Sequence, residues 1–120
     1  MKTILHISDL HFGRTHPPAI AALERFLNTL EKKLDLIIVS GDWTQRARRA
    51  QFKEAAEFID RIKTPIVSVP GNHDIPLYDA FRRMINPFSR YREFIKPRTL
   101  AEFSDKDLVV VGINTVTRWR

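Results

Sequence analysis

The order of apolar segments along the chain is the feature that most constrains its fold. Short apolar runs of strand length alternate with longer segments whose apolar residues recur at helical spacing. The predicted strands cover residues 3–7, 36–39, 66–69 and 108–113. Strand–helix–strand connections are right-handed and build a largely parallel sheet, so the sequence predicts a strand–helix alternating α/β fold.

Two amphipathic segments separate the first three predicted strands. Residues 17–34 and 52–62 both carry apolar side chains at helical spacing, and we expect a helix in each. Residues 77–94 are expected to form short helices that break at Pro87. The unbroken apolar run at residues 36–39 is typical of a strand covered on both faces.

Composition excludes several classes of protein. With 43% hydrophobic residues in a chain of 120, there is enough apolar sequence for the core of one domain. The chain has no cysteine, which excludes disulfides and thiolate metal sites. No apolar run approaches the roughly 20 residues of a membrane-spanning helix. His6 and Asp9 also interrupt the N-terminal segment where a signal peptide is apolar. The sequence therefore predicts a soluble protein of the cytoplasm with no membrane partner.

The net charge of +6 comes largely from two groups of basic residues. One interpretation is attraction of an anionic substrate, such as a phosphate ester or a nucleic acid. The other is a solvated surface, or one that pairs with acidic sequence outside this chain. The second is favoured because no regular aromatic residues mark a base-stacking platform, so nucleic acid stays possible without being favoured. The groups are Arg46, Arg48 and Arg49, and Arg82, Arg83, Arg90, Arg92, Lys96 and Arg98.

Polar residues follow each of the first three predicted strands. The first strand runs into Asp9 and His11, the second into Asp42, and the third into Asn-His-Asp at residues 72–74. Ligands bind at the carboxyl ends of parallel strands, so these loops are expected to meet. Asp-x-His or Gly-Asp alone is commoner as turn chemistry than as a metal site, whereas Gly-Asn-His-Asp after a β-branched run is a stronger indication. Together, and each closing a strand, they predict a site of oxygen and imidazole ligands that suits Mn²⁺, Fe or Zn²⁺ better than Ca²⁺.

The three loops resemble the first three motifs of the calcineurin-like metallophosphoesterases: they read HISDLHFG, VSGDWTQ and VPGNHD. The resemblance spans essentially the whole chain. It implies that Asp9 and His11 bind a first divalent metal ion, that Asp42 bridges two ions, and that Asn72 binds the second. Two ions about 3.5–4 Å apart polarise phosphoryl oxygens and activate a water for attack on phosphorus.

The same resemblance assigns catalytic roles and a fold. His73 would face the phosphate as an acid, and Asp74 would hydrogen-bond His73 and fix its tautomer. The implied fold is the N-terminal half of a four-layer α/β/β/α sandwich. The family's later motifs supply further histidines, but this chain has 4 histidines and none follows His73. Residues 1–120 are therefore expected to be a phosphoesterase domain truncated on its C-terminal side, with an exposed sheet face that favours self-association.

Two functions remain open at this point. The first is a metal-dependent phosphohydrolase in its full-length form, with this piece alone inactive. By loose similarity to bacterial cyclic-nucleotide phosphodiesterases, its expected substrate is a small phosphodiester such as a cyclic nucleotide, while a nucleotide-sugar pyrophosphate or a DNA end stays possible. The second is a degenerate module that binds metal or phosphate without catalysis.

Overall fold

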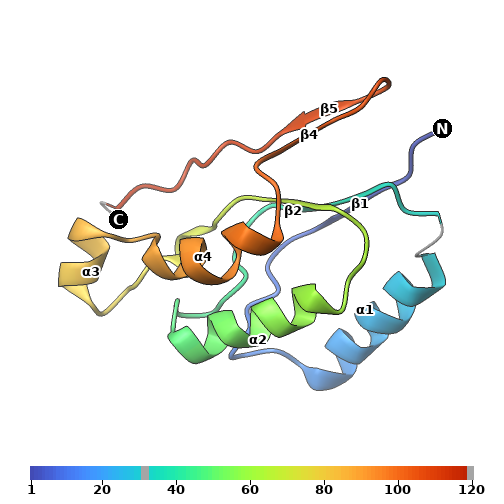
Figure 1. Cartoon of the computed structure of the whole chain (residues 1–120). Coiled ribbons are helices and arrows are strands. Elements are labelled where there is room, and N and C mark those ends of the chain that lie inside the picture. Colours follow the sequence, from blue (N-terminus) through green and yellow to red (C-terminus); the bar gives the residue numbers. More distant parts are fainter. Residues whose placement is uncertain (31–32, 119–120) are drawn as a thin grey trace.

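The parallel sheet forms as the sequence predicts. The computed structural model describes residues 1–30 and 33–118 of the chain. Strands and helices alternate along the first half of the chain (Figure 1): β1 (Ile4–Ile7), α1 (Pro17–Leu30), β2 (Leu36–Val39), α2 (Arg49–Asp60) and β3 (Ile66–Ser68). The strands lie in the order β1-β2-β3, and both neighbouring pairs are parallel. Because the register places Ile7 opposite Val39 and Val39 opposite Ser68, all three strands end at one edge.

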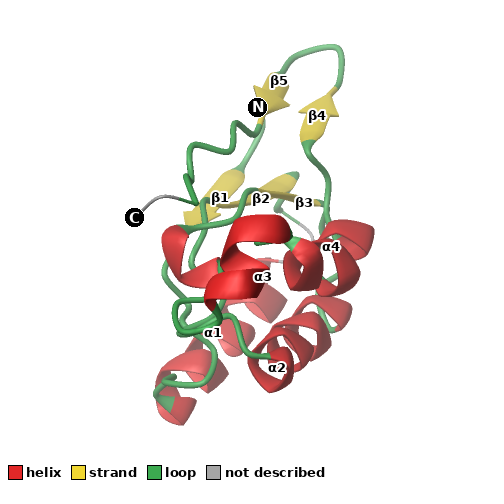
Figure 2. Ribbon diagram, turned by 90° about the vertical axis from the view of Figure 1, so that its left-hand side faces the viewer, coloured by secondary structure: helices red, strands yellow, loops and turns green. Residues whose placement is uncertain are grey.

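Helices α1 and α2 cover one face of this sheet, as both Figure 1 and Figure 2 show. Alternate strand residues point to that face, and in β2 these are Ile37 and Val39. They join one core with Leu27 of α1 and with Phe52 and Phe58 of α2. Burying each such aliphatic or aromatic side chain stabilises the fold by roughly 1.5–3 kcal/mol. The apolar residues that recur at helical spacing in the sequence therefore form the helix faces that pack against the strands.

The segment after β3 folds into short helices, which confirms the prediction for residues 77–94. These are η1 (Asn72–Asp74), α3 (Ala80–Ile85), α4 (Ser89–Phe94) and η2 (Lys96–Arg98). Pro87 lies between α3 and α4, where its ring prevents a continuous helix. Helix α4 packs on α2, with the Phe94 ring stacked on Phe52 at 6.4 Å between centroids.

The C-terminal strands form a separate two-stranded sheet on the other side of β1-β2-β3 from the helices (Figure 2). Strand β5 (Val109–Val111) lies inside the predicted strand at residues 108–113, but it pairs antiparallel with β4 (Glu102–Ser104), which the sequence did not predict. Leu100 instead extends the parallel sheet by one bridge to Val67. In β5, Val109 and Val111 remain 66% and 58% exposed, so apolar surface is present on this side; self-association through it stays a prediction.

Several basic residues form ion pairs or hydrogen bonds with other residues of the same chain. Arg49 pairs with Glu93 at 2.8 Å, Arg98 pairs with Asp60 at 2.9 Å, and Arg90 donates to the Ala47 carbonyl at 2.9 Å. Both interpretations of the basic groups, attraction of an anionic substrate and a solvated surface or one that pairs with acidic sequence outside this chain, stay predictions. No helix within the described ranges has the length and apolar character that crossing a membrane requires.

Candidate active site

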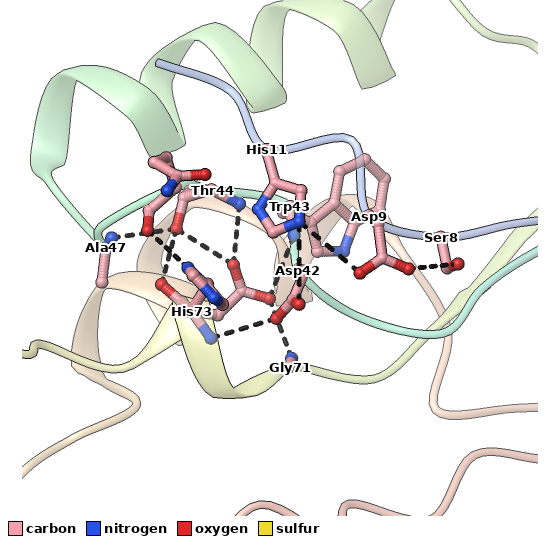
Figure 3. A network of polar contacts seen from close by, with 11 residues as sticks. Ser8, Asp9, His11, Asp42, Trp43, Thr44, Ala47, Gly71 and His73 are labelled. Carbon is pink, nitrogen blue, oxygen red and sulfur yellow. Dashed lines mark hydrogen bonds and ion pairs between the residues drawn. The ribbon is translucent and has the colours of Figure 1, made fainter. Parts of the chain in front are cut away.

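Residues from the loops after the three strands lie close together, as the labelled side chains of Asp9, His11, Asp42 and His73 show (Figure 3). The first two continue the pairing of β1 with β2, because Asp9 N–H donates to Gly41 O at 3.1 Å and His11 N–H donates to Asp42 O at 2.9 Å. The third loop joins them where His73 N–H donates to Asp42 Oδ1 at 3.0 Å. The carboxyl ends of the strands therefore meet, as the sequence predicts for a parallel sheet.

The side chains of Asp9, His11 and Asp42 form a cluster able to hold a metal ion. One ligand atom of each lies within 4.8 Å of the others. His11 Nε2 is turned toward both carboxylates, 3.5 Å from Asp9 Oδ1 and 3.9 Å from Asp42 Oδ2 (Figure 3). A hydrogen bond from the Ser8 hydroxyl at 2.5 Å holds the pKa of Asp9 below its usual value, so Asp9 is ionised at neutral pH. Two carboxylates and an imidazole are a donor set that fits a divalent transition metal.

The backbone at these same residues adopts an uncommon conformation. Asp9, His11 and Asp42 have φ values of 59°, 50° and 55°. Residues other than glycine rarely adopt this left-handed region, and holding one there costs on the order of 1–3 kcal/mol. Such strain persists only where the surrounding hydrogen bonds fix the loop, and it is concentrated at functional sites. The conformation is what aims three side chains from two loops at one point.

Two glycines let the second and third loops approach closely. Gly41 has φ 110°, and a Cβ placed on it would lie 2.8 Å from the Cα of Gly71. A Cβ on Gly71 would lie 2.0 Å from Asp42 Oδ1. Only glycine leaves room at these positions. This close contact brings the Asp42 carboxylate against the loop that carries the remaining candidate residues.

Asn72 and His73 flank the cluster on the side of the third loop. Asn72 is exposed and lines a hollow together with Asp42 and Ser40. The His73 ring packs edge-to-face on the His11 ring, with centroids 4.9 Å apart. His73 Nδ1 lies 2.7 Å from the Gln45 carbonyl oxygen. Since a carbonyl only accepts hydrogen bonds, Nδ1 carries a proton, and Nε2 is the nitrogen left for chemistry.

The hypothesis that Asp74 hydrogen-bonds His73 and fixes its tautomer is wrong. Asp74 is buried, and its carboxylate accepts from Trp43 N–H and Gly71 N–H at Oδ2 and from Thr44 N–H and the Thr44 hydroxyl at Oδ1. Successive side chains of the 3-10 turn η1 point in different directions, so Asp74 faces inward while His73 faces the cluster. Gln45 O takes the role assigned to Asp74, and a main-chain carbonyl leaves no signal in a sequence.

Asp74 instead links the second loop to the third. Burial raises its pKa to about 6, while the hydrogen bonds from Gly71 and Thr44 oppose this rise. Behind it, Trp43 Nε1–H donates to Ser68 Oγ at 2.8 Å, and Ser68 Oγ lies 2.7 Å from the Tyr91 hydroxyl. Burial also raises the pKa of Tyr91, so its hydroxyl stays neutral. This buried hydrogen-bond network holds in place the loops that carry the candidate metal ligands.

The chain belongs to the calcineurin-like phosphoesterase family, whose model matches residues 2–118. This confirms the resemblance read from the three loops. Over 90 residues the chain is 30% identical to the 3',5'-cyclic adenosine monophosphate phosphodiesterase CpdA of Escherichia coli strain K12, a match that covers 66% of this chain and 33% of that protein.

Two further relatives are similar over shorter stretches. Identity is 28% over 80 residues with the glycerophosphodiester phosphodiesterase GpdQ of Enterobacter lignolyticus, covering 59% of this chain and 29% of the relative. It is 28% over 83 residues with a probable cyclic nucleotide phosphodiesterase of Synechococcus, covering 62% and 32%. The chain thus spans about a third of the length of the curated relatives that it matches.

Proposed function

We propose that the chain forms the metal-binding part of a phosphohydrolase that cleaves phosphate esters with a dinuclear metal centre. The observation that carries the proposal is the convergence of Asp9, His11 and Asp42, with ligand atoms within 4.8 Å of one another. Membership of the calcineurin-like phosphoesterase family supports the reaction class. When bound, two divalent ions would supply Lewis-acid activation of a water and of the phosphoryl oxygens.

The two oxygens of Asp42 face different parts of the site, which supports a bridging role. Oδ2 faces His11 Nε2 at 3.9 Å, and Oδ1 accepts from His73 N–H at 3.0 Å, on the side of the third loop. In the proposal, Asp9 and His11 would hold one ion together with the Asp42 carboxylate. The same carboxylate and Asn72 would hold the other. Mn²⁺, Fe and Zn²⁺ all suit these ligands.

His73 is proposed as the acid that protonates the leaving oxygen. The hydrogen bond from Nδ1 to Gln45 O, at 2.7 Å, fixes the ring and keeps a proton on Nδ1. Loss of a proton from Nε2 therefore leaves the neutral Nδ1–H tautomer with no need for the ring to turn. Asp74 contributes by holding the loop that carries His73, through its hydrogen bonds to Trp43 and Thr44.

Metal content of an Asp42→Asn variant tests the proposal. One charge shared by two ions is removed, so we expect affinity for both Mn²⁺ ions to fall at least tenfold, given that even loss of an outer hydrogen bond to a ligand costs roughly 10–100-fold. The full-length protein is loaded with Mn²⁺ and its content is measured by elemental analysis. Asp60→Asn, which removes only a surface pair with Arg98 at 2.9 Å, is the matched control. Two ions held as tightly in Asp42→Asn as in the control would overturn the bridging role.

The substrate proposed for the full-length enzyme is a small phosphodiester, with a cyclic nucleotide first among candidates, since relatives named as cyclic nucleotide phosphodiesterases match this chain. A cytoplasmic location stays a prediction.

The histidine count favours one alternative for the isolated chain, a binding module without catalysis. The chain has 4 histidines. Among the described residues, His11 and His73 are the two at the site, so the second ion would keep Asp42 and Asn72 as its protein ligands. Multiple turnover of a nitrophenyl phosphodiester by the 120-residue chain, at roughly 1 s⁻¹ or more, would exclude that alternative.

A further inference from the structure

A hollow beside His73 extends the candidate site away from the metal cluster. Its wall includes Arg46, Asn72, Leu77 and Tyr78. His73 and Asn72 line the hollow and also belong to the candidate site. A group attached to a phosphate held at the cluster would therefore reach into this space. The side chains that line it are in position to recognise that group.

Arg46 presents a cation that has no carboxylate partner among the described residues. Its Nη1 donates to the Tyr78 hydroxyl at 2.7 Å, and its Cζ lies 5.1 Å from the centroid of the Tyr78 ring. Within the part of the chain that the structure describes, no carboxylate pairs with Arg46, whereas Arg49 and Arg98 each bind one. The guanidinium carries five N–H donors, so several remain for an acceptor in the hollow.

The loop that carries Arg46 is fixed before any ligand arrives. Arg46 N–H donates to Gln51 Oε1 at 2.8 Å. The next residue, Ala47, is buried at φ 54°, its N–H donates to Thr44 Oγ1 at 3.0 Å, and its carbonyl accepts from Arg90 at 2.9 Å. A loop held at both its N–H and C=O groups fixes the backbone from which the side chain extends, so less loop entropy is lost on binding.

Tyr78 offers an aromatic face next to this cation. It is 77% exposed, and the neighbouring Leu77 is 55% exposed. A single exposed aromatic residue is ordinary on a protein surface. This one is anchored by Arg46 and lines the same hollow as His73. The combination of an anchored ring, an adjacent apolar side chain and free guanidinium donors matches a flat group that carries hydrogen-bond acceptors.

We propose that Arg46 and Tyr78 form the subsite for the organic group of the substrate, and that this group is the heterocyclic base of a nucleotide. The base stacks on the Tyr78 ring, and Arg46 donates hydrogen bonds to its ring-nitrogen acceptors. A polyol such as glycerol has no face to stack and gains little from the ring. The inference rests on the proposed function, because it needs the phosphate to be held at the Asp9, His11 and Asp42 cluster.

Calorimetric binding to the Mn²⁺-loaded full-length chain tests this subsite with three probes: AMP, glycerol 3-phosphate and inorganic phosphate. Tyr78→Ala should weaken AMP binding about 5- to 150-fold, equivalent to the ~1–3 kcal/mol of one stacked base, and change the other two less than about twofold. Tyr78→Phe keeps the ring and should retain most of the AMP affinity. Arg46→Ala should weaken AMP selectively, with Arg49→Ala, whose partner Glu93 lies on the surface, as the matched control.

The possible outcomes distinguish failure of the proposed base subsite from failure of the proposed phosphate site. Equal affinity of the wild type for AMP and glycerol 3-phosphate, or an equal loss of all three probes in Tyr78→Ala, overturns the subsite and leaves the phosphate site standing. Absence of Mn²⁺-dependent binding of every probe to the wild type overturns the proposed function and the subsite with it. Because Tyr78 is exposed, its variants should keep the circular dichroism spectrum of the wild type.

Discussion

Asp74 accepts four hydrogen bonds, and replacing it separates its packing role from its charge. The donors are Trp43 N–H, Gly71 N–H, Thr44 N–H and the Thr44 hydroxyl. Asparagine has nearly the same shape but offers one acceptor oxygen and one NH₂ group. Alanine offers neither. The two variants should therefore lower the free energy of unfolding by different amounts.

The structure sets the size of each loss. The amide of Asp74→Asn should place its NH₂ at the Oδ1 position, because the Thr44 hydroxyl there can turn to accept it. One buried donor, Thr44 N–H, is then left without an acceptor, at a cost of about 1–3 kcal/mol. In Asp74→Ala three backbone N–H groups lose their acceptor, so the loss should be roughly 3 kcal/mol or more. The second figure is a large share of the ~5–15 kcal/mol that stabilises a typical domain.

Urea unfolding followed by tryptophan fluorescence measures both losses, since Trp43 is buried beside Asp74. The two variants are compared with each other at pH 8, because the raised pKa of about 6 for Asp74 means that its charge destabilises the wild type at this pH, an effect that both neutral variants lack. Asp60→Asn is the control, because its surface pair with Arg98 should contribute at most about 1 kcal/mol. An alanine variant as stable as the asparagine variant, or more stable, would refute the reasoning.

Three further predictions follow from the site. In the full-length enzyme, His73→Gln should lower kcat by roughly 10²–10⁴ with unchanged metal content; normal turnover of a substrate with a poor leaving group would exclude the acid role. The raised pKa of Tyr91 implies stability that is complete below pH ~10, near the usual tyrosine pKa, and is lost as pH rises above it. Tyr91→Phe should therefore flatten the decline in melting temperature between pH 8 and 11, at a cost of about 1 kcal/mol at pH 8 for the lost bond to Ser68; parallel declines would contradict this. Gly71→Ala, whose Cβ would lie 2.0 Å from Asp42 Oδ1, should weaken Mn²⁺ binding in a calorimetric titration, and unchanged affinity would show that the loops move apart freely.

The parallel sheet could be predicted because its signals are local. Residues 36–39 are an unbroken apolar run that ends in Ser-Gly, and they form β2 with the predicted bounds. Strand β4 could not be predicted in the same way. Its three residues, Glu102–Ser104, have one apolar side chain between two polar ones, and their strand conformation depends on pairing with β5. Tertiary pairing of this kind overrides weak local propensity.

In the candidate site, too, some features could be predicted from the sequence, and others depend on tertiary contacts and could not. The sequence predicts that Asp9, His11 and Asp42 meet, because a parallel sheet places the ends of its strands at one edge, and the structure gathers them. The direction of a side chain within a short turn is a tertiary property, so the sequence assigned the wrong partner to His73. The contact of Arg46 with Tyr78 joins residues 32 positions apart and follows no motif.

The left-handed backbone at Asp9, His11 and Asp42 has a consequence for the affinity of the proposed metal site. The loops are already bent into the conformation that presents their ligands, and this bend is held by main-chain hydrogen bonds between the first two loops. An arriving ion would not have to order a flexible chain, so its binding free energy is not reduced by that conformational entropy. The free energy needed to shape the proposed metal site is thus supplied when the sheet and its loops fold, before any ion binds.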